Sequence, residues 1–115
     1  MFDEPQFRMM KPNAVLINTS RGGIVNLDAL DRALREGLIA CAGIDVYEHE
    51  PPDVNLPLLS NPNAICTPHL SWVSEESFFS LREKVFQNVR RFVEGEPRVH
   101  VVNATELAEY QAKKE

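Results

Sequence analysis

AVLINTS, residues 14–20, begins as an uninterrupted apolar run and then becomes polar. An apolar run without alternation is typical of a strand that is covered on both faces in a parallel sheet. Two further apolar runs follow along the chain, CAGIDV at residues 41–46 and AICT at residues 64–67. The three runs therefore predict three short strands of one sheet.

A helix is predicted between the first two runs. In NLDALDRALREG, residues 26–37, leucines and alanines recur at helical spacing, Asn26 can cap the N-terminus, and Gly37 can end the helix in the left-handed conformation. A helix is also the usual crossover between parallel strands. The order strand, helix, strand, loop, strand therefore predicts an α/β fold with a parallel sheet.

The remaining segments predict a long loop and a helical C-terminal part. Residues 47–63 contain prolines and asparagines that favour turns and leave little room for a regular element. Ser74 begins a long predicted helix that ends at Gly95, and residues 98–103 and 104–115 predict a short extended segment and a weak terminal helix. We interpret the apolar stripe of the long helix as packing surface; its members are Phe78, Leu81, Val85, Val89, Phe92 and Val93.

Composition and charge exclude several classes of protein. The chain has 115 residues, of which 43% are hydrophobic and 25% are charged, as in ordinary globular proteins. Its formal net charge of -5 gives no support to direct nucleic-acid binding. No apolar run approaches the roughly 20 residues that span a bilayer, and the N-terminus does not resemble a signal peptide. We therefore expect a soluble, cytoplasmic protein with no nucleic-acid or membrane partner.

Ionisable side chains follow each of the three apolar runs. Arg21 follows the first run, Asp45 lies near the end of the second and Glu50 follows it, and His69 follows the third. Because the carboxyl ends of parallel strands meet at one edge of a sheet, we expect these side chains to converge. Arg21 can bind a carboxylate bidentately, and Glu50 can orient His69 and favour its imidazolium form. Together they predict an acid catalyst for carbonyl reduction beside an anionic group.

The motifs around these residues resemble those of a known family. INTSRGGIVNLDAL, EGLIACAGIDVYEHEPP and CTPHLSW occur here in the order and approximate spacing of the D-isomer-specific 2-hydroxyacid dehydrogenases. The resemblance runs from about Phe7 to Asn103. It implies the C-terminal half of a Rossmann-like doubly wound parallel sheet. It also implies hydride transfer between a nicotinamide and a 2-oxo or 2-hydroxy acid, with Arg21, Glu50 and His69 as catalytic residues.

The resemblance also implies a cofactor and a substrate site. The cofactor is NAD, with NADP not excluded, and the substrate residues are Arg21, His69 and Trp72. Trp72 three residues beyond His69 is similar to the branch of C-terminal-binding protein corepressors, which suggests a larger, less polar 2-oxo acid. In the family the aspartate corresponding to Asp45 contacts the nicotinamide carboxamide. The residues expected to line the cofactor are Thr19, Ser20, Arg21, Asp45, His69, Leu70, Ser71 and Trp72.

One motif of the family is missing from these 115 residues. None of the glycines forms the GxGxxG turn that holds the pyrophosphate of a dinucleotide. We therefore expect an incomplete domain, with residues 1–103 as the C-terminal part of the NAD-binding domain and residues 104–115 as a polar tail. Such a chain is expected to be inactive alone. An in-frame GxGxxG encoded upstream would make it part of an intact enzyme, which we expect to be a homo-oligomer.

Simpler interpretations of two of these residues stay open beside this one. Arg21 before two glycines is also compatible with a turn that carries a solvated charge, and Trp72 with ordinary packing. A metal site could also be suggested by the carboxylates and imidazoles of Glu48, His49, Glu50 and His69, but we predict no metal site. A dehydrogenase-like interaction module of the corepressor type is the alternative function.

Overall fold

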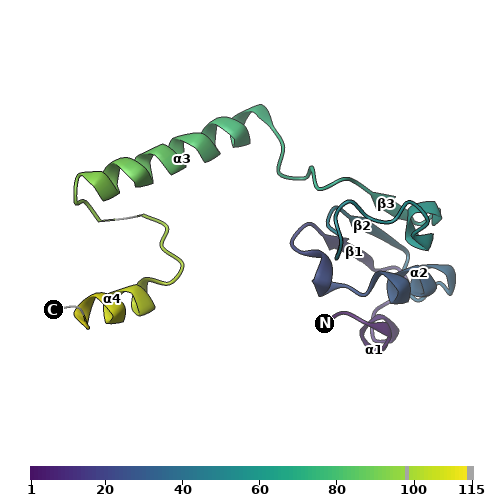
Figure 1. The fold of residues 1–115 in the computed structure, drawn as a ribbon. Coiled ribbons are helices and arrows are strands. Elements are labelled where there is room, and N and C mark those ends of the chain that lie inside the picture. Colours follow the sequence, from purple (N-terminus) through teal and green to yellow (C-terminus); the bar gives the residue numbers. More distant parts are fainter. Residues whose placement is uncertain (98, 114–115) are drawn as a thin grey trace. The chain divides into compact units, whose positions relative to one another are not determined.

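The computed structural model describes residues 1–97 and 99–113. It divides into two compact units, Met1–Trp72 and a second unit that begins at Val73, and each is described here by itself (Figure 1). The division between the two units therefore falls just after the CTPHLSW motif. The predicted division at residue 103 stays a prediction.

A three-stranded parallel sheet forms the centre of the first unit. Its strands are β1 (Val15–Asn18), β2 (Cys41–Ile44) and β3 (Ala64–Cys66), in the order β1-β2-β3 (Figure 1). All three arise from the apolar runs, although each strand is shorter than its run. The register aligns the carboxyl ends of the three strands, because Asn18 lies beside Ile44 and Ile44 beside Cys66. The predicted α/β fold with a parallel sheet is confirmed.

Helix α2 (Leu27–Arg35) connects β1 to β2 and forms the core with the sheet. The Asn26 side chain caps the helix by accepting hydrogen bonds from the backbone N–H groups of residues 28 and 29. Gly37, with a φ of +69°, follows the C-terminus of α2, as predicted. The buried face of the helix packs with the inward side chains of β1 and β2; these residues are Leu16, Ala29, Leu30, Ala33, Leu34, Ala42 and Ile44.

The opposite face of the sheet is exposed, which corrects one expectation. Along β1 the side chains alternate, so that Leu16 is buried while Val15 and Ile17 are 56% and 71% exposed. Ile65 of β3 is also exposed, at 74%. Within this unit the strands are therefore covered on one face only. An uninterrupted apolar run could not distinguish this arrangement from a sheet with both faces covered, because every position of the run is apolar.

Helix α1 (Glu4–Arg8) was not predicted from the sequence. Asp3 and Gln6 form a reciprocal capping box at its N-terminus, and Phe7 is fully buried in the core. The chain before the helix also forms a parallel bridge between Phe2 and Val25. The spacing of Asp3 and Gln6 is a recognised start signal for a helix. A helix of five residues is too short for a hydrophobic period, and this explains why it was missed.

The proline-rich loop contains more structure than we expected. A 3-10 helix, η2 (Pro57–Ser60), lies within it and buries Leu58 completely. After η2, the Nδ2 of Asn61 donates a hydrogen bond of 2.7 Å to Oδ1 of Asp31 on α2, and both side chains are buried. The loop is therefore fixed to the helix. A second 3-10 helix, η1 (Gly22–Ile24), lies between β1 and α2.

The second unit consists of two helices, α3 (Glu75–Val93) and α4 (Ala104–Ala112). Ser74 caps α3, and Gly95, with a φ of +73°, follows its end, as predicted. None of the residues of α3 is buried in the structure, so the expected packing of its apolar stripe is not found. The predicted extended segment begins at residue 98, outside the described residues, and 99–103 form no strand. No helix in the described part of the chain has the length and hydropathy needed to cross a membrane.

We expect Phe7→Ala to lower the free energy of unfolding of the first unit by roughly 3–5 kcal/mol, because it leaves a cavity in the core. Met9→Ala is the matched control, since Met9 follows the same helix and is 85% exposed. Its effect should stay within about 0.5 kcal/mol. Urea denaturation followed by the fluorescence of the single tryptophan measures both. Equal effects of the two substitutions would show that α1 does not dock as described.

Candidate active site

A buried asparagine organises the turn after β1. Asn18 is the last residue of the strand and is 5% exposed. Its Nδ2 donates a hydrogen bond of 2.9 Å to the Arg21 carbonyl, and its Oδ1 accepts one of 3.1 Å from the Ser20 N–H. One side chain therefore fixes the backbone that presents Thr19, Ser20 and Arg21 at the carboxyl end of the sheet.

Gly22 allows this turn to lie against the loop that follows β2. It is buried, and a Cβ atom built there would lie 1.9 Å from the Tyr47 carbonyl carbon and 2.3 Å from the Glu48 nitrogen. Only a glycine permits so close an approach between two backbones. The contact brings the turn of Arg21 next to the segment that leads to Glu50.

Asp45 connects the end of β2 to the turn after β3. Its Oδ1 accepts hydrogen bonds from the Thr67 hydroxyl and from the Leu70 N–H, and its Oδ2 accepts one from the Ser71 N–H at 2.9 Å. The residue is only 3% exposed. Burial alone would raise the pKa of Asp45, but the hydrogen bonds outweigh it and hold the pKa well below its usual range. Asp45 is therefore an ionised anchor for the segment that contains His69.

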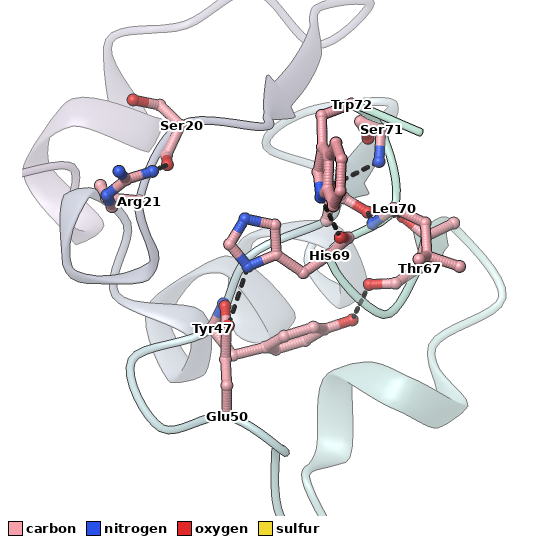
Figure 2. Close-up of polar contacts among 10 residues, drawn as sticks. Ser20, Arg21, Tyr47, Glu50, Thr67, His69, Leu70, Ser71 and Trp72 are labelled. Atoms are coloured by element: carbon pink, nitrogen blue, oxygen red, sulfur yellow. Dashed lines mark hydrogen bonds and ion pairs between the residues drawn. The ribbon is translucent and has the colours of Figure 1, made fainter. Parts of the chain in front are cut away.

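Glu50 and His69 form a hydrogen-bonded pair. The Nδ1 of His69 lies 2.8 Å from Oε2 of Glu50, and Oε1 of Glu50 accepts a hydrogen bond of 3.0 Å from the Tyr47 N–H. The hydrogen bond with His69 lowers the pKa of Glu50 most, and the one from the Tyr47 N–H lowers it further. An ionised carboxylate only accepts hydrogen bonds, so Nδ1 carries a proton in this pair. The second ring nitrogen faces away from Glu50 (Figure 2).

Arg21 and His69 share two open cavities at this edge of the sheet. A cavity of about 300 Å³ is lined by Arg21, Glu50 and His69 together with Gly22 and the segment from Val46 to Glu48. The Arg21 guanidinium folds back on its own turn, where Nη1 donates a hydrogen bond of 2.7 Å to the Ser20 carbonyl (Figure 2). The structure therefore brings Arg21, Glu50 and His69 together, as predicted, and Asp45 lies with Arg21 and His69 at the second cavity.

The second cavity matches the residues expected for the cofactor. It measures about 350 Å³, and all of its lining residues come from the expected set: Thr19, Arg21, Asp45, His69, Ser71 and Trp72. Ser20 and Leu70 do not line it. Ser20 contributes its carbonyl to Arg21, and Leu70 contributes its N–H to Asp45. A larger cavity of about 500 Å³ contains neither Arg21 nor His69, so we do not assign the site to it.

Three polar residues of the site were missed in the sequence. They are Asn18, Tyr47 and Thr67. The Tyr47 hydroxyl donates a hydrogen bond of 3.1 Å to the Thr67 carbonyl. Burial, and to a smaller extent the neighbouring Cys66, raise the pKa of Tyr47 to about 12. The one available signal was Asn18, because a polar side chain within an apolar strand must find partners when it is buried.

We predicted no metal site at the segment from Glu48 to Glu50. Glu48 and His49 are both exposed. Across residues 1–97 and 99–113, no group of three or more histidine, cysteine, aspartate or glutamate side chains is arranged to hold a metal.

Comparison with known proteins places these motifs in a family. The profile described as D-isomer specific 2-hydroxyacid dehydrogenase, NAD binding domain, matches residues 1–71. The chain belongs to this family. A glyoxylate reductase from Thermococcus litoralis is 43% identical over 103 residues, which cover 90% of this chain and 31% of that protein. The chain thus spans about a third of the length of its dehydrogenase relatives.

Solved structures of the family share the fold. A D-lactate dehydrogenase with NAD+ from Lactobacillus jensenii aligns with a TM-score of 0.74 and 31% identity, over 88% of this chain and 34% of that chain. A probable 2-hydroxyacid dehydrogenase from Rhizobium etli, in complex with NADP, aligns with a TM-score of 0.75 and 33% identity. The alignment covers 89% of this chain and 33% of that chain. These dehydrogenases do not favour the interaction-module alternative, and the corepressor branch stays a prediction.

We expect Gly22→Ala to destabilise the first unit by about 1–3 kcal/mol, because backbone rather than a flexible side chain must move to admit the Cβ. Gly23→Ala is the matched control, since no atom lies within 4 Å of a Cβ at that position. Chemical denaturation of both variants measures the difference. A tolerated alanine at residue 22 would mean that the two loops do not approach so closely.

Acid should weaken the anchor at Asp45. A carboxyl whose pKa is lowered on folding stabilises the native state above its ordinary pKa of about 4, and this stabilisation is lost as the pH falls through the lowered value. Asp45→Asn should therefore be less stable than the wild type at pH 7, and the difference should narrow below about pH 4. Urea midpoints measured from pH 7 to pH 2 test this. A difference that is constant with pH would contradict it, and Glu48→Gln, an exposed neighbour, is the control.

Proposed function

We propose that this chain provides the proton-transfer and substrate-orienting part of a nicotinamide-dependent D-2-hydroxyacid dehydrogenase. The observation that carries the proposal is the contact of 2.8 Å between His69 and Glu50, beside the cavity that Arg21 also lines. An imidazole held by a carboxylate at one nitrogen is an acid or base at the other. The nearby guanidinium suits a substrate that carries a carboxylate next to its reactive carbonyl.

His69 moves the proton in the proposed reaction. In the direction of reduction, its protonated second nitrogen donates a proton to the carbonyl oxygen of the 2-oxo acid, and the negative charge of Glu50 stabilises the imidazolium before transfer. In the direction of oxidation, the neutral ring accepts the proton of the hydroxyl group. The nicotinamide cofactor supplies or accepts the hydride at C2. Glu50 keeps the ring orientation constant through both directions.

Arg21 binds and orients the substrate. Its planar fork matches the geometry of a carboxylate and can also polarise the adjacent carbonyl. In the structure one of its nitrogens donates to the Ser20 carbonyl, and Arg21 lines both cavities. We propose Trp72 as a third residue that faces the substrate, because it lines the cavity of about 350 Å³ with Arg21 and His69.

The second cavity fits the nicotinamide end of the cofactor. Asp45, Ser71 and Thr19 give it a polar lining of the kind that a carboxamide needs, and the glycine-rich turn for the pyrophosphate is not among these residues. We propose NAD or NADP as the cofactor, since relatives bind either one. The cytoplasmic location, the homo-oligomer and the inactivity of the chain alone stay predictions.

The proposal predicts a reaction that can be measured directly. A gene product that contains these residues together with a glycine-rich half should oxidise NADH or NADPH in the presence of a 2-oxo acid. The panel comprises glyoxylate and pyruvate as small substrates and phenylpyruvate as a larger, less polar one. His69→Ala is the control and should remove the activity. If the wild type oxidised neither cofactor with any of these acids, the proposal would be refuted.

Arg21→Ala should lower kcat/KM more than Arg21→Lys in the same enzyme. Hydrogen bonds to charged groups contribute about 1.5–3 kcal/mol, so the alanine variant should lose roughly tenfold to a hundredfold. Lysine retains the charge but loses the planar fork, and its loss should be smaller. Steady-state kinetics with a saturating cofactor measures both. Equal losses would argue against bidentate binding of the carboxylate.

A further inference from the structure

The peptide group that joins His69 to Leu70 is held at both ends. At one end, the Nε1–H of Trp72 donates a hydrogen bond of 3.1 Å to the His69 carbonyl. At the other end, the Leu70 N–H donates one of 2.8 Å to Oδ1 of Asp45. Figure 2 shows the indole next to the His69 backbone, on the other side of the imidazole from Glu50. The two contacts fix the plane of this peptide group.

The backbone of His69 needs such support. Its φ is +56°, in the left-handed region that side chains other than glycine rarely adopt. Such a conformation persists only where the surroundings fix it. Since φ and ψ of His69 set the direction of its Cα–Cβ bond, a relaxed backbone would turn the ring away from Glu50. The orientation of the ring therefore depends on the peptide group beyond it.

We propose that Trp72 and Asp45 are positioning residues that hold the His69 backbone in the left-handed conformation. This inference rests on the proposed function in so far as His69 transfers the proton. It gives both residues a task in addition to the one that the family resemblance implies. Asp45 is 3% exposed and its carboxylate already accepts hydrogen bonds from the turn, while the indole N–H of Trp72 donates to the His69 backbone.

Trp72 can combine this task with contact to a substrate. Its side chain is 48% exposed, so one part of the ring remains accessible while the N–H is used internally. The two tasks differ in the atoms that they need. Phenylalanine keeps an aromatic surface but has no N–H donor, so Trp72→Phe removes the hydrogen bond to the His69 carbonyl and retains an aromatic ring.

Amide hydrogen exchange in the 115-residue chain, without cofactor or substrate, tests the inference. In Trp72→Phe the Leu70 N–H should exchange about three- to tenfold faster, as expected for the loss of one net hydrogen bond. The sheet amide of Ala42, which donates to the Asn63 carbonyl, should keep its wild-type rate. Leu70→Ala is the control in the same turn, because it changes an exposed side chain and leaves the backbone contacts.

A second measurement reports on the imidazole itself. In the wild type, the ¹⁵N shift of Nδ1 of His69 should indicate a hydrogen-bonded N–H, and in Trp72→Phe it should move towards that of the exposed His49. If Trp72 only stabilised the fold as a whole, Trp72→Phe would instead accelerate amide exchange at Leu70 and Ala42 alike.

Three results would overturn the inference. They are unchanged exchange at Leu70 in Trp72→Phe, uniform acceleration of both amides, and a wild-type Leu70 amide that exchanges as fast as those of the exposed loop at residues 53–55. Because no turnover is measured, a failed dehydrogenase assay does not affect this test.

Discussion

The carboxylate of Asp45 is the contact on which the geometry of the site depends. Asp45 directly follows the central strand of the sheet, and its carboxylate accepts hydrogen bonds from three residues of the turn that follows the neighbouring strand. A buried carboxylate is unstable without such donors, and the turn has no strand pairing to define its shape. Each feature therefore stabilises the other. His69 lies inside this turn, so its position follows from the end of β2 as much as from β3.

The parallel sheet explains why residues far apart in sequence meet. Parallel strands in register end at the same edge, and the three strands here end at Asn18, Ile44 and Cys66. Arg21, Asp45 and His69 each follow one of these ends within a few residues. The close contact of Gly22 with the Tyr47 backbone then adds the loop of Glu50 to the same edge. No element has to be long or deeply buried for the site to form.

The local part of this structure could be predicted from the sequence, and the part that depends on distant contacts could not. Asn26, Gly37 and Ser74 act within their own turn of chain, and the structure confirms all three as helix signals. Helix α1 depends on burying Phe7 in the core of the unit, which no local pattern shows. Likewise Asn18 could be marked as unusual in an apolar run, but its partners at residues 20 and 21 depend on the shape of the turn.

The residues that the structure shows in contact with His69 lie in the first unit. Under the proposed function, the orientation of this histidine is therefore separate from the binding of the dinucleotide. The histidine, its carboxylate and the anchors of its backbone occupy residues 45–72. Most of the binding free energy of a dinucleotide is instead expected from a glycine-rich turn and the helix N-terminus behind it. The contacts that orient the His69 ring therefore lie within residues 45–72, apart from the residues expected to bind most of the dinucleotide. A preorganised ring costs no reorganisation when substrate arrives, which is the condition under which electrostatic catalysis is most effective.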